Sequence, residues 1–313
     1  MRPLESVPNV SEGRDRAIVE AIGHAFASVG AQLLDTHVDA DHHRSVFTLI
    51  GDDRVLEDGL VAGVAAARDA IDLRHHDGVH PRVGAADVVP IVPLWRDDAG
   101  RAERVALTVA RRLGDEVGAT VFLYGSLADG RRPAFYRRGG PEELQRRIHA
   151  RELAPAYGPR TIDPLAGAVL VGVRAPLLAF NVGLDGSLEV AEQVAAAVRE
   201  SSGGLPGVQA LGLRLRGGIQ VSTNVVDLGA TEPHVLVDRI VREAEERGAA
   251  VGRGELVGLV PASSVVAAAV ASGVVNAVGP GGVPTDEALA AAARALLLER
   301  LEPDRVLEWH LAR

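Results

Sequence analysis

The chain contains no cysteine, which excludes disulfide bonds and thiolate chemistry and fits a reducing compartment. Aromatic side chains make up only 3% of the 313 residues, which argues against platforms on which nucleic-acid bases stack. The formal net charge of −9 also disfavours nucleic acid, because phosphate binding needs a basic surface. No run reaches the ~18 apolar residues of a membrane span, and the first residues lack the apolar stretch of a signal peptide. We therefore expect a cytoplasmic protein that binds neither nucleic acid nor a membrane.

The apolar residues predict one order of elements twice. They make up 47% of the sequence, enough for sizeable cores, and the length favours two domains. The order is strand, helix, strand, strand, helix, strand, with Ser11 as the N-cap of the first helix. In the first half the predicted elements are a short start at 3–7, a helix at 17–26, strands at 32–35 and 45–50, a helix at 55–71 and a strand at 85–94. In the second half they are a strand at 177–182, a helix at 188–199, a hairpin of 209–214 and 220–226, a helix at 233–247 and a strand at 256–260.

This repetition predicts an α/β protein with two related halves. Each half is a split β-α-β (ferredoxin-like) layer with helices on one face of a sheet. Such a layer leaves the other sheet face uncovered, so we expect the two sheets to pack face to face with the helices outside and the ligand in the seam. A Gly- and Pro-rich linker at 279–284 precedes a terminal helix that starts at Thr285 and runs to about 300, interpreted as packing or oligomer surface.

The region between the halves carries less pattern. It predicts an Arg- and Ala-rich surface helix at 100–118, a strand at 121–124, an irregular loop at 125–140 and a helix from there to 151. The segment 154–172 is rich in Gly, Pro and Ala, which would let the backbone approach a flat ligand closely. The same composition also suits a plain linker between domains, and both interpretations stay open.

Two polar loops carry the candidate chemistry. Residues 75–87 contain three histidines, an arginine and two carboxylates just before an apolar run, and residues 37–44 form a second polar loop at the mouth of another strand. Together the loops hold six of the ten histidines. Groups that exchange protons or hold an anion, placed in loops at strand ends, are typical of catalytic sites.

Within the first loop, His80 and Arg82 are the main candidates. The proline between them favours an extended backbone, which places both side chains on one side. The imidazole can move protons near neutral pH, while the guanidinium can grip a substrate carboxylate and keep the imidazole neutral. We interpret the pair as part of a group-transfer site; the alternative is a histidine satisfied within a loop hydrogen-bond network.

Other chemistries find less support in the motifs. No strong metal spacing such as His-Glu-x-x-His is present, and no Gly-rich nucleotide loop or Gly-x-Ser-x-Gly elbow occurs. We expect no metal, although a metal hydrolase remains an alternative on residue types alone. The residues of suitable type are Asp39, Asp41, His42, His43, His76 and His80.

Six segments resemble, in the same order, segments of the glutamate formimidoyltransferase (formiminotransferase) family in its single-function form, which lacks the cyclodeaminase domain. Several motifs in order are more specific than any one of them, and they fall between about residues 3 and 272. The segments are 7–13, 39–46, 76–87, 155–159, 179–182 and 220–224.

The resemblance implies transfer of the formimidoyl group from N-formimidoyl-L-glutamate to N5 of tetrahydrofolate in histidine catabolism. Tetrahydrofolate would be the co-substrate, bound in a tunnel between two α/β subdomains at 1–175 and 176–272, and 273–313 would be a linker and helical tail. The expected partners are these small molecules, a second copy of the chain in a homodimer, and a separate cyclodeaminase that acts downstream.

The resemblance also assigns residues by motif. His80 matches the family's catalytic histidine, which would carry a proton from the attacking folate nitrogen to the departing glutamate nitrogen. Arg82 would hold a carboxylate, and the loop from Asp39 to Arg44 would orient the amidine, whose donor nitrogens pair with carboxylates. Gly158–Gly167 matches the folate-contacting segment. The expected catalytic residues are His80, Arg82 and Asp39, and the expected binding residues are Arg44, His42, His76, Gly158, Pro159, Gly167 and Asn181.

The sequence departs from the family pattern at several positions. His37 stands where some members have aspartate, His43 replaces asparagine, Val79 replaces glutamate, and Ala156-Tyr157 replaces Asp-Phe. Two alternatives within the fold therefore stay open: a transferase that uses another formimidoyl or formyl donor, and a folate-binding protein without catalysis.

Overall fold

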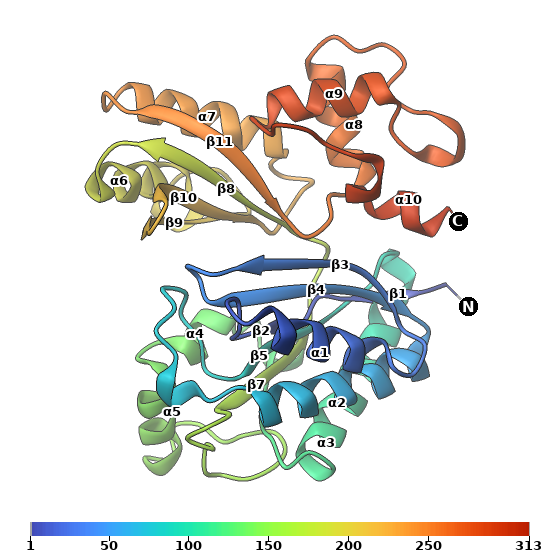
Figure 1. Ribbon diagram of the computed structural model, residues 1–313, viewed down its shortest axis with the longest axis vertical. Helices are drawn as coiled ribbons and strands as arrows, with labels where there is room; N and C mark the ends of the chain where they lie inside the picture. Colours follow the sequence, from blue (N-terminus) through green and yellow to red (C-terminus); the bar gives the residue numbers. More distant parts are fainter. Residues whose placement is uncertain (1, 313) are drawn as a thin grey trace. The chain divides into compact units, whose positions relative to one another are not determined.

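One order of elements, strand–helix–strand–strand–helix–strand, occurs twice in the chain (Figure 1). The computed structural model describes residues 2–312, and they divide into a first unit that ends at Ala175 and a second unit that begins at Pro176. The repeated elements of the first unit are β1 (Leu4–Ser6) with β2 (Asn9–Val10), α1 (Arg16–Ala27), β3 (Gln32–Asp39), β4 (Arg44–Gly51), α2 (Asp53–Ala70) and β5 (Ala86–Val92). Those of the second are β8 (Leu178–Asp185), α6 (Leu188–Val198), β9 (Val208–Leu215), β10 (Gly218–Val225), α7 (Pro233–Glu245) and β11 (Ala250–Val257). The predicted α/β class with two related halves is confirmed.

The sheet of the first unit has seven strands. Its antiparallel part runs in the order β5, β1 with β2, β4, β3. β7 (Ala168–Val173) pairs in parallel with both β5 and β6 (Thr120–Gly125), and α3 (Ala99–Asp115) provides the crossover that a parallel connection needs. The linker interpretation of 154–172 is therefore wrong for its last part, because an apolar run with a strand on each side becomes a central strand.

Helices α1, α2 and α3 cover one face of this sheet, where apolar side chains form the main core of the first unit. The helix starts follow from capping. Asp15, and not the predicted Ser11, caps α1 by accepting from the backbone N–H groups of Ala17 and Ile18. Ser11 instead donates its hydroxyl to the carbonyl of Gly84, so it ties the first strands to the loop before β5.

The other face of β5, β7 and β6 is covered as well. Residues 125–140, predicted as an irregular loop, contain α4 (Pro133–Arg137), and α5 (Gly140–His149) follows it. Their Tyr136 and Leu144 pack against Phe122 and Leu170 on this face. The prediction of helices on only one face of the sheet is thus too simple for the first unit, because parallel strands are usually buried on both faces. α3 was predicted as a surface helix, but one side of it is buried and carries apolar residues such as Val105.

The second unit has a four-stranded antiparallel sheet in the order β11, β8, β10, β9. Its core lies between this sheet and α6 and α7. β11 begins six residues before the strand predicted at 256–260. The prediction missed this first part because Gly252, Arg253 and Gly254 interrupt the apolar pattern, at the place where the pairing of β11 with β8 has an irregular register. Three more helices follow: α8 (Ala262–Ala271), α9 (Asp286–Ala295) and α10 (Leu307–Leu311).

The C-terminal tail packs on the second unit. Leu289, Leu296, Leu301 and Val306 belong to the same core as the strands of that unit. Thr285 caps α9, as predicted, by accepting from a backbone N–H. Across residues 2–312, no helix combines the length and the apolar character needed to cross a membrane.

Candidate active site

The two polar loops come together in the first unit. Residues 40–43 form the turn between β3 and β4, and residues 76–85 lead from a 3-10 turn (Leu73–His75) into β5. Nε2 of His76 lies 2.8 Å from the carbonyl oxygen of His43, and the N–H of Val79 donates to the carbonyl oxygen of Asp41. Gly78 packs so closely that a Cβ there would collide with the carbonyl oxygen of His42. Loops separated by more than thirty residues thus make one surface.

Asp39 and His42 form a hydrogen-bonded pair at this turn. One carboxylate oxygen accepts from the backbone N–H groups of Asp41 and His42, and the other lies 2.6 Å from Nδ1 of His42. Burial would raise the pKa of Asp39, but the side-chain and backbone hydrogen bonds from His42 outweigh it and lower the pKa to about 2. The carboxylate is therefore ionised at neutral pH.

A second pair, His43 and His76, stacks beside it. The rings are parallel within 13°, with centroids 4.1 Å apart. His76 accepts from the N–H of Gly78 at Nδ1, so its proton lies on Nε2, which donates to the carbonyl of His43. Burial, with the charge of Arg82 as a smaller contribution, lowers the pKa of His76 to about 4. Nε2 of His43 lies 3.1 Å from Glu12.

His80 lies at the edge of this surface, half-buried. Its ring centroid is 6.1 Å from that of His42. Its Nδ1 is buried and has no hydrogen-bond partner within the described part of the chain. Burial lowers the pKa of His80 to about 2, and the charges of Arg44 and Arg137 add to this effect. At neutral pH the imidazole is uncharged and can accept a proton.

Arg44, Asp87 and Arg137 form a buried charged cluster, close enough to His80 for their charges to act on its imidazole. Oδ2 of Asp87 accepts from Nη1 of Arg44 at 2.9 Å and from Nη2 of Arg137, while Oδ1 accepts from the N–H of Val83 at 2.8 Å. Asp87 is completely buried. Burial would raise its pKa, but the two guanidinium charges outweigh this and hold the pKa far below the usual range. The cluster therefore carries two positive charges and one negative charge.

Sequence reasoning identified Arg44 as a binding residue but missed Arg137. It lies in the segment 125–140, which was predicted as an irregular loop and which contains four arginines and one aspartate. The available signal was that richness in charge, in a segment enclosed by apolar elements.

Arg82 contacts its own loop. Its Nη2 donates to the carbonyl of His76 at 2.6 Å and its Nη1 donates to the carbonyl of Gly78 at 3.3 Å. These bonds hold the loop between the stacked histidines and His80. Asn181, the predicted binding residue of the second unit, lies on β8 and donates to Glu255 at 2.9 Å.

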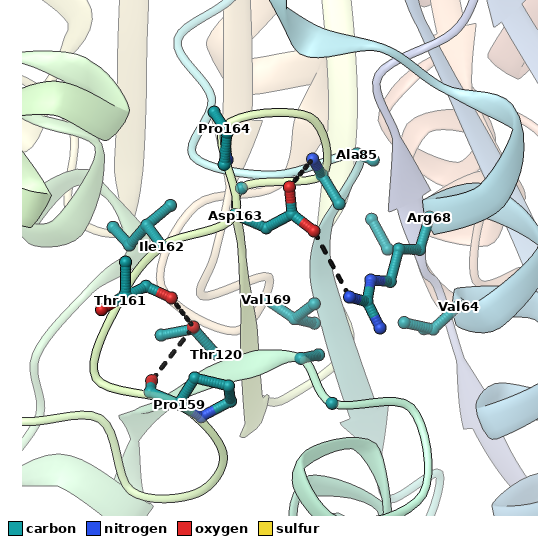
Figure 2. Close-up of a pocket in the computed structure, with 15 residues that line it drawn as sticks. Val64, Arg68, Ala85, Thr120, Pro159, Thr161, Ile162, Asp163, Pro164 and Val169 are labelled. Carbon is teal, nitrogen blue, oxygen red and sulfur yellow. Dashed lines mark hydrogen bonds and ion pairs between the residues drawn. The ribbon is translucent and has the colours of Figure 1, made fainter.

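A cavity of about 250 Å³ opens elsewhere in the first unit (Figure 2). It includes Pro159 and Gly167 of the predicted folate-contacting segment, but neither His80 nor its charged neighbours line it. Nη2 of Arg68 lies 3.3 Å from a carboxylate oxygen of Asp163, as Figure 2 shows. The volume lies below the ~300 Å³ at which sites for drug-sized ligands begin.

Gly158 and Gly167 have structural reasons to be glycine. Both have positive φ values, 76° and 72°. A Cβ at Gly158 would collide with the carbonyl oxygen of Ala119, and one at Gly167 with that of Val83. Close backbone packing therefore accounts for these two glycines without a ligand.

Comparisons with known proteins agree with the resemblance. The model of the formiminotransferase domain, N-terminal subdomain, matches residues 3–174, and that of the formiminotransferase domain matches residues 179–272. The chain belongs to the formiminotransferase family. Glutamate formimidoyltransferases of Streptococcus pyogenes serotype M1 and Thermoplasma acidophilum are each 36% identical to it, over 84% and 85% of this chain and 90% of each relative. Formimidoyltransferase-cyclodeaminase of Sus scrofa is 37% identical over 85% of this chain, but over only 51% of its own length.

As a formiminotransferase, the chain is a transferase, and the family prediction from its motifs is confirmed. The matched residues include every site residue described above in the first unit and Asn181 in the second. The tail with α9 and α10 lies beyond the region that the family model matches.

Proposed function

We propose that this chain transfers the formimidoyl group from N-formimidoyl-L-glutamate to N5 of tetrahydrofolate, as a step of histidine catabolism. The family and the names of the two relatives matched over 90% of their length support the donor. The observation that carries the mechanism is a neutral imidazole, His80, at the edge of a buried cluster with excess positive charge. Tetrahydrofolate is the co-substrate, and no metal takes part in the proposed steps.

The reaction replaces one carbon–nitrogen bond with another. N5 of the folate attacks the amidine carbon, and a tetrahedral intermediate forms. The bond from that carbon to the glutamate nitrogen then breaks, and the nitrogen leaves as an amine. N5 must lose a proton and the leaving nitrogen must gain one. In our proposal His80 takes the first proton and delivers the second, so it is unchanged at the end.

The electrostatics of the site suit the first half of this cycle. A low pKa keeps His80 free to accept a proton, but efficient return of the proton needs a pKa nearer the working pH. Part of the lowering comes from Arg44 and Arg137. A donor that places a carboxylate beside these guanidinium groups offsets their charge and raises the pKa of His80.

The neighbouring residues take positioning roles in this proposal. The ionised carboxylate of Asp39 and the ring of His42 orient the amidine, whose nitrogens are hydrogen-bond donors. Arg82 and His76 hold the loop that carries His80. The carboxylate-binding role predicted for Arg82 stays a prediction.

The folate site is proposed on the resemblance, with Gly158–Gly167 and Asn181 as contacts. The presence of Pro159 and Gly167 in the wall of the cavity supports a ligand near this segment. The cavity alone is too small for a whole folate, so we expect it to take at most part of the molecule.

A turnover assay with a matched pair of variants tests the proposal. The purified protein should release glutamate from N-formimidoyl-L-glutamate only when tetrahydrofolate is present, and the product should carry the new group on N5. His80→Ala should lower kcat by about 100-fold or more, the usual contribution of a proton-transfer group. His75→Ala is the control, because its side chain lies in the same segment but is 82% exposed. Equal activity of both variants would remove His80 from the mechanism. If the protein turned over a different donor but not N-formimidoyl-L-glutamate, the proposed donor would be wrong.

We further propose a cytoplasmic homodimer that passes its product to a separate cyclodeaminase. Exposed valines on and after α8 support self-association: Val270, Val275 and Val278 are 56%, 91% and 55% exposed. Light scattering after size-exclusion chromatography gives the mass, and a monomer at micromolar concentration contradicts the dimer.

A further inference from the structure

The charged cluster beside His80 has more positive than negative charge. Both oxygens of Asp87 are occupied: Oδ2 by Arg44 and Arg137, and Oδ1 by the N–H of Val83. One carboxylate therefore serves two guanidinium groups. A buried charge without a partner is costly, and the natural partner of a guanidinium is a carboxylate or a phosphate. The cluster is one anion short of neutrality.

Arg137 is the member that a ligand can reach. The exposed fraction of the side chain is 15% for Arg137, 9% for Arg44 and 0% for Asp87. Its Nε is buried and donates no hydrogen bond to any residue between 2 and 312. Only one of its terminal nitrogens bonds to Asp87, so the group retains capacity for a second anion.

The surroundings of Arg137 hold it in place without neutralising it. The hydroxyl of its neighbour Tyr136 donates to the carbonyl of Leu123 on β6, at 2.7 Å. Arg147 of α5 donates to the backbone carbonyl of Phe135 at 2.8 Å, and its guanidinium lies over the aromatic ring of Phe135. α4 is thereby tied to the sheet and to α5, and the guanidinium at its end is fixed before a ligand arrives, which reduces the entropy lost on binding.

We propose that Arg137, together with Arg44, binds the α-carboxylate of the donor beside His80, and so selects donors that are amino acids. This inference rests on the proposed function. In the proposed reaction His80 protonates the nitrogen on the α-carbon of glutamate, and the α-carboxylate is bonded to that same carbon. The γ-carboxylate is two carbons further along the chain. The group that lies nearest to the reacting nitrogen is therefore the one that the guanidinium groups beside His80 can hold.

Binding of two donors in the absence of folate tests this inference, because no transfer can occur without the acceptor. N-formimidoyl-L-glutamate carries the α-carboxylate, and N-formimidoyl-4-aminobutyrate lacks it but keeps the distal one. Isothermal titration of the wild-type protein should give a Kd at least about tenfold lower for the first compound, as expected for a well-placed charge-assisted pair. Arg137→Gln should abolish this preference by weakening only the first compound, and Arg137→Lys should retain part of it.

Arg138→Gln is the matched control, because Arg138 is the exposed neighbour on the same segment and should leave both Kd values unchanged. Arg137→Gln is expected to fold, since Asp87 keeps Arg44 and the N–H of Val83. If it does not fold, the wild-type preference and Arg137→Lys still decide. Equal binding of the two compounds by the wild type, or an undiminished preference in Arg137→Gln, overturns the inference while formimidoyl transfer stands. Failure to bind or turn over N-formimidoyl-L-glutamate at all overturns the proposed function itself.

Discussion

Replacing Asp87 with asparagine should destabilise the first unit by about 3–5 kcal/mol at neutral pH, the range found when one partner of a buried ion pair is removed. The amide has the size of the carboxylate, so it leaves no cavity and can still accept from the N–H of Val83. It carries no charge, however. Arg44 and Arg137 then lie together with no negative group between them, and neither side chain is more than 15% exposed. The cost is therefore electrostatic.

A double-mutant cycle isolates this effect. Arg137→Gln alone should cost about 1.5–3 kcal/mol, the value of one hydrogen bond to a charged group, because Asp87 still has Arg44. In the double variant the repulsion between the two guanidinium groups is gone. Its cost should therefore fall short of the sum of the single costs by at least about 1 kcal/mol. Urea denaturation followed by circular dichroism measures each value, and the transition that shifts should belong to the first unit alone.

The pH dependence gives a second check. The folded-state pKa of Asp87 lies below its ordinary value of 3.8, since the charges of Arg137 and Arg44 outweigh the effect of burial. Its contribution to stability is therefore complete above pH 3.8 and is lost as the pH falls through the lower, folded-state pKa. The difference in the free energy of unfolding between the wild type and Asp87→Asn should therefore become smaller in that acid range. A gap under 1 kcal/mol at pH 7, or fully additive effects in the cycle, would refute the reasoning.

Two further variants test the turn and the loop. Asp39→Asn should lower the free energy of unfolding by about 2 kcal/mol at neutral pH, the equivalent of a pKa lowered from 3.8 to about 2. The difference in unfolding free energy between this variant and the wild type should vanish as the pH falls through about 2. An unchanged urea midpoint at pH 7 contradicts the prediction. Gly78→Ala should cost about 1–3 kcal/mol and lower kcat, because the new methyl group displaces the loop from the carbonyl of His42. Gly217→Ala, in an open turn, is its control, and equal effects of the two substitutions would remove the packing argument.

The repeated order of elements could be predicted because its signals are local. Apolar spacing along residues 55–71 predicts a helix at nearly the observed place, Asp53–Ala70. The small residues of the turn at 216–218 predict the hairpin that became β9 and β10. The predictions failed where context outweighed pattern. Residues 168–173 look like part of a linker until strands on both sides bury them, and β11 contains glycines that weaken its apolar pattern.

The candidate site divides in the same way. The two histidine-rich loops stood out in the sequence, because so many titratable groups in short Gly- and Pro-bounded segments are unusual. Their contact depends on Gly78 and on the bond between His76 and His43, which spacing along the chain does not reveal. Arg137 gave only a compositional signal, since it reaches Asp87 across 50 residues.

The amino-acid sequence by itself determined the family, the repeated α/β order and the identity of His80 as the leading candidate, because motifs and periodicity are properties of neighbouring residues. Tertiary structure alone decided that two arginines share Asp87 beside that histidine, and that Arg82 is bonded to its own loop. Charge balance and burial depend on which distant segments of the chain the fold brings together, and the packing of the whole unit decides which segments meet.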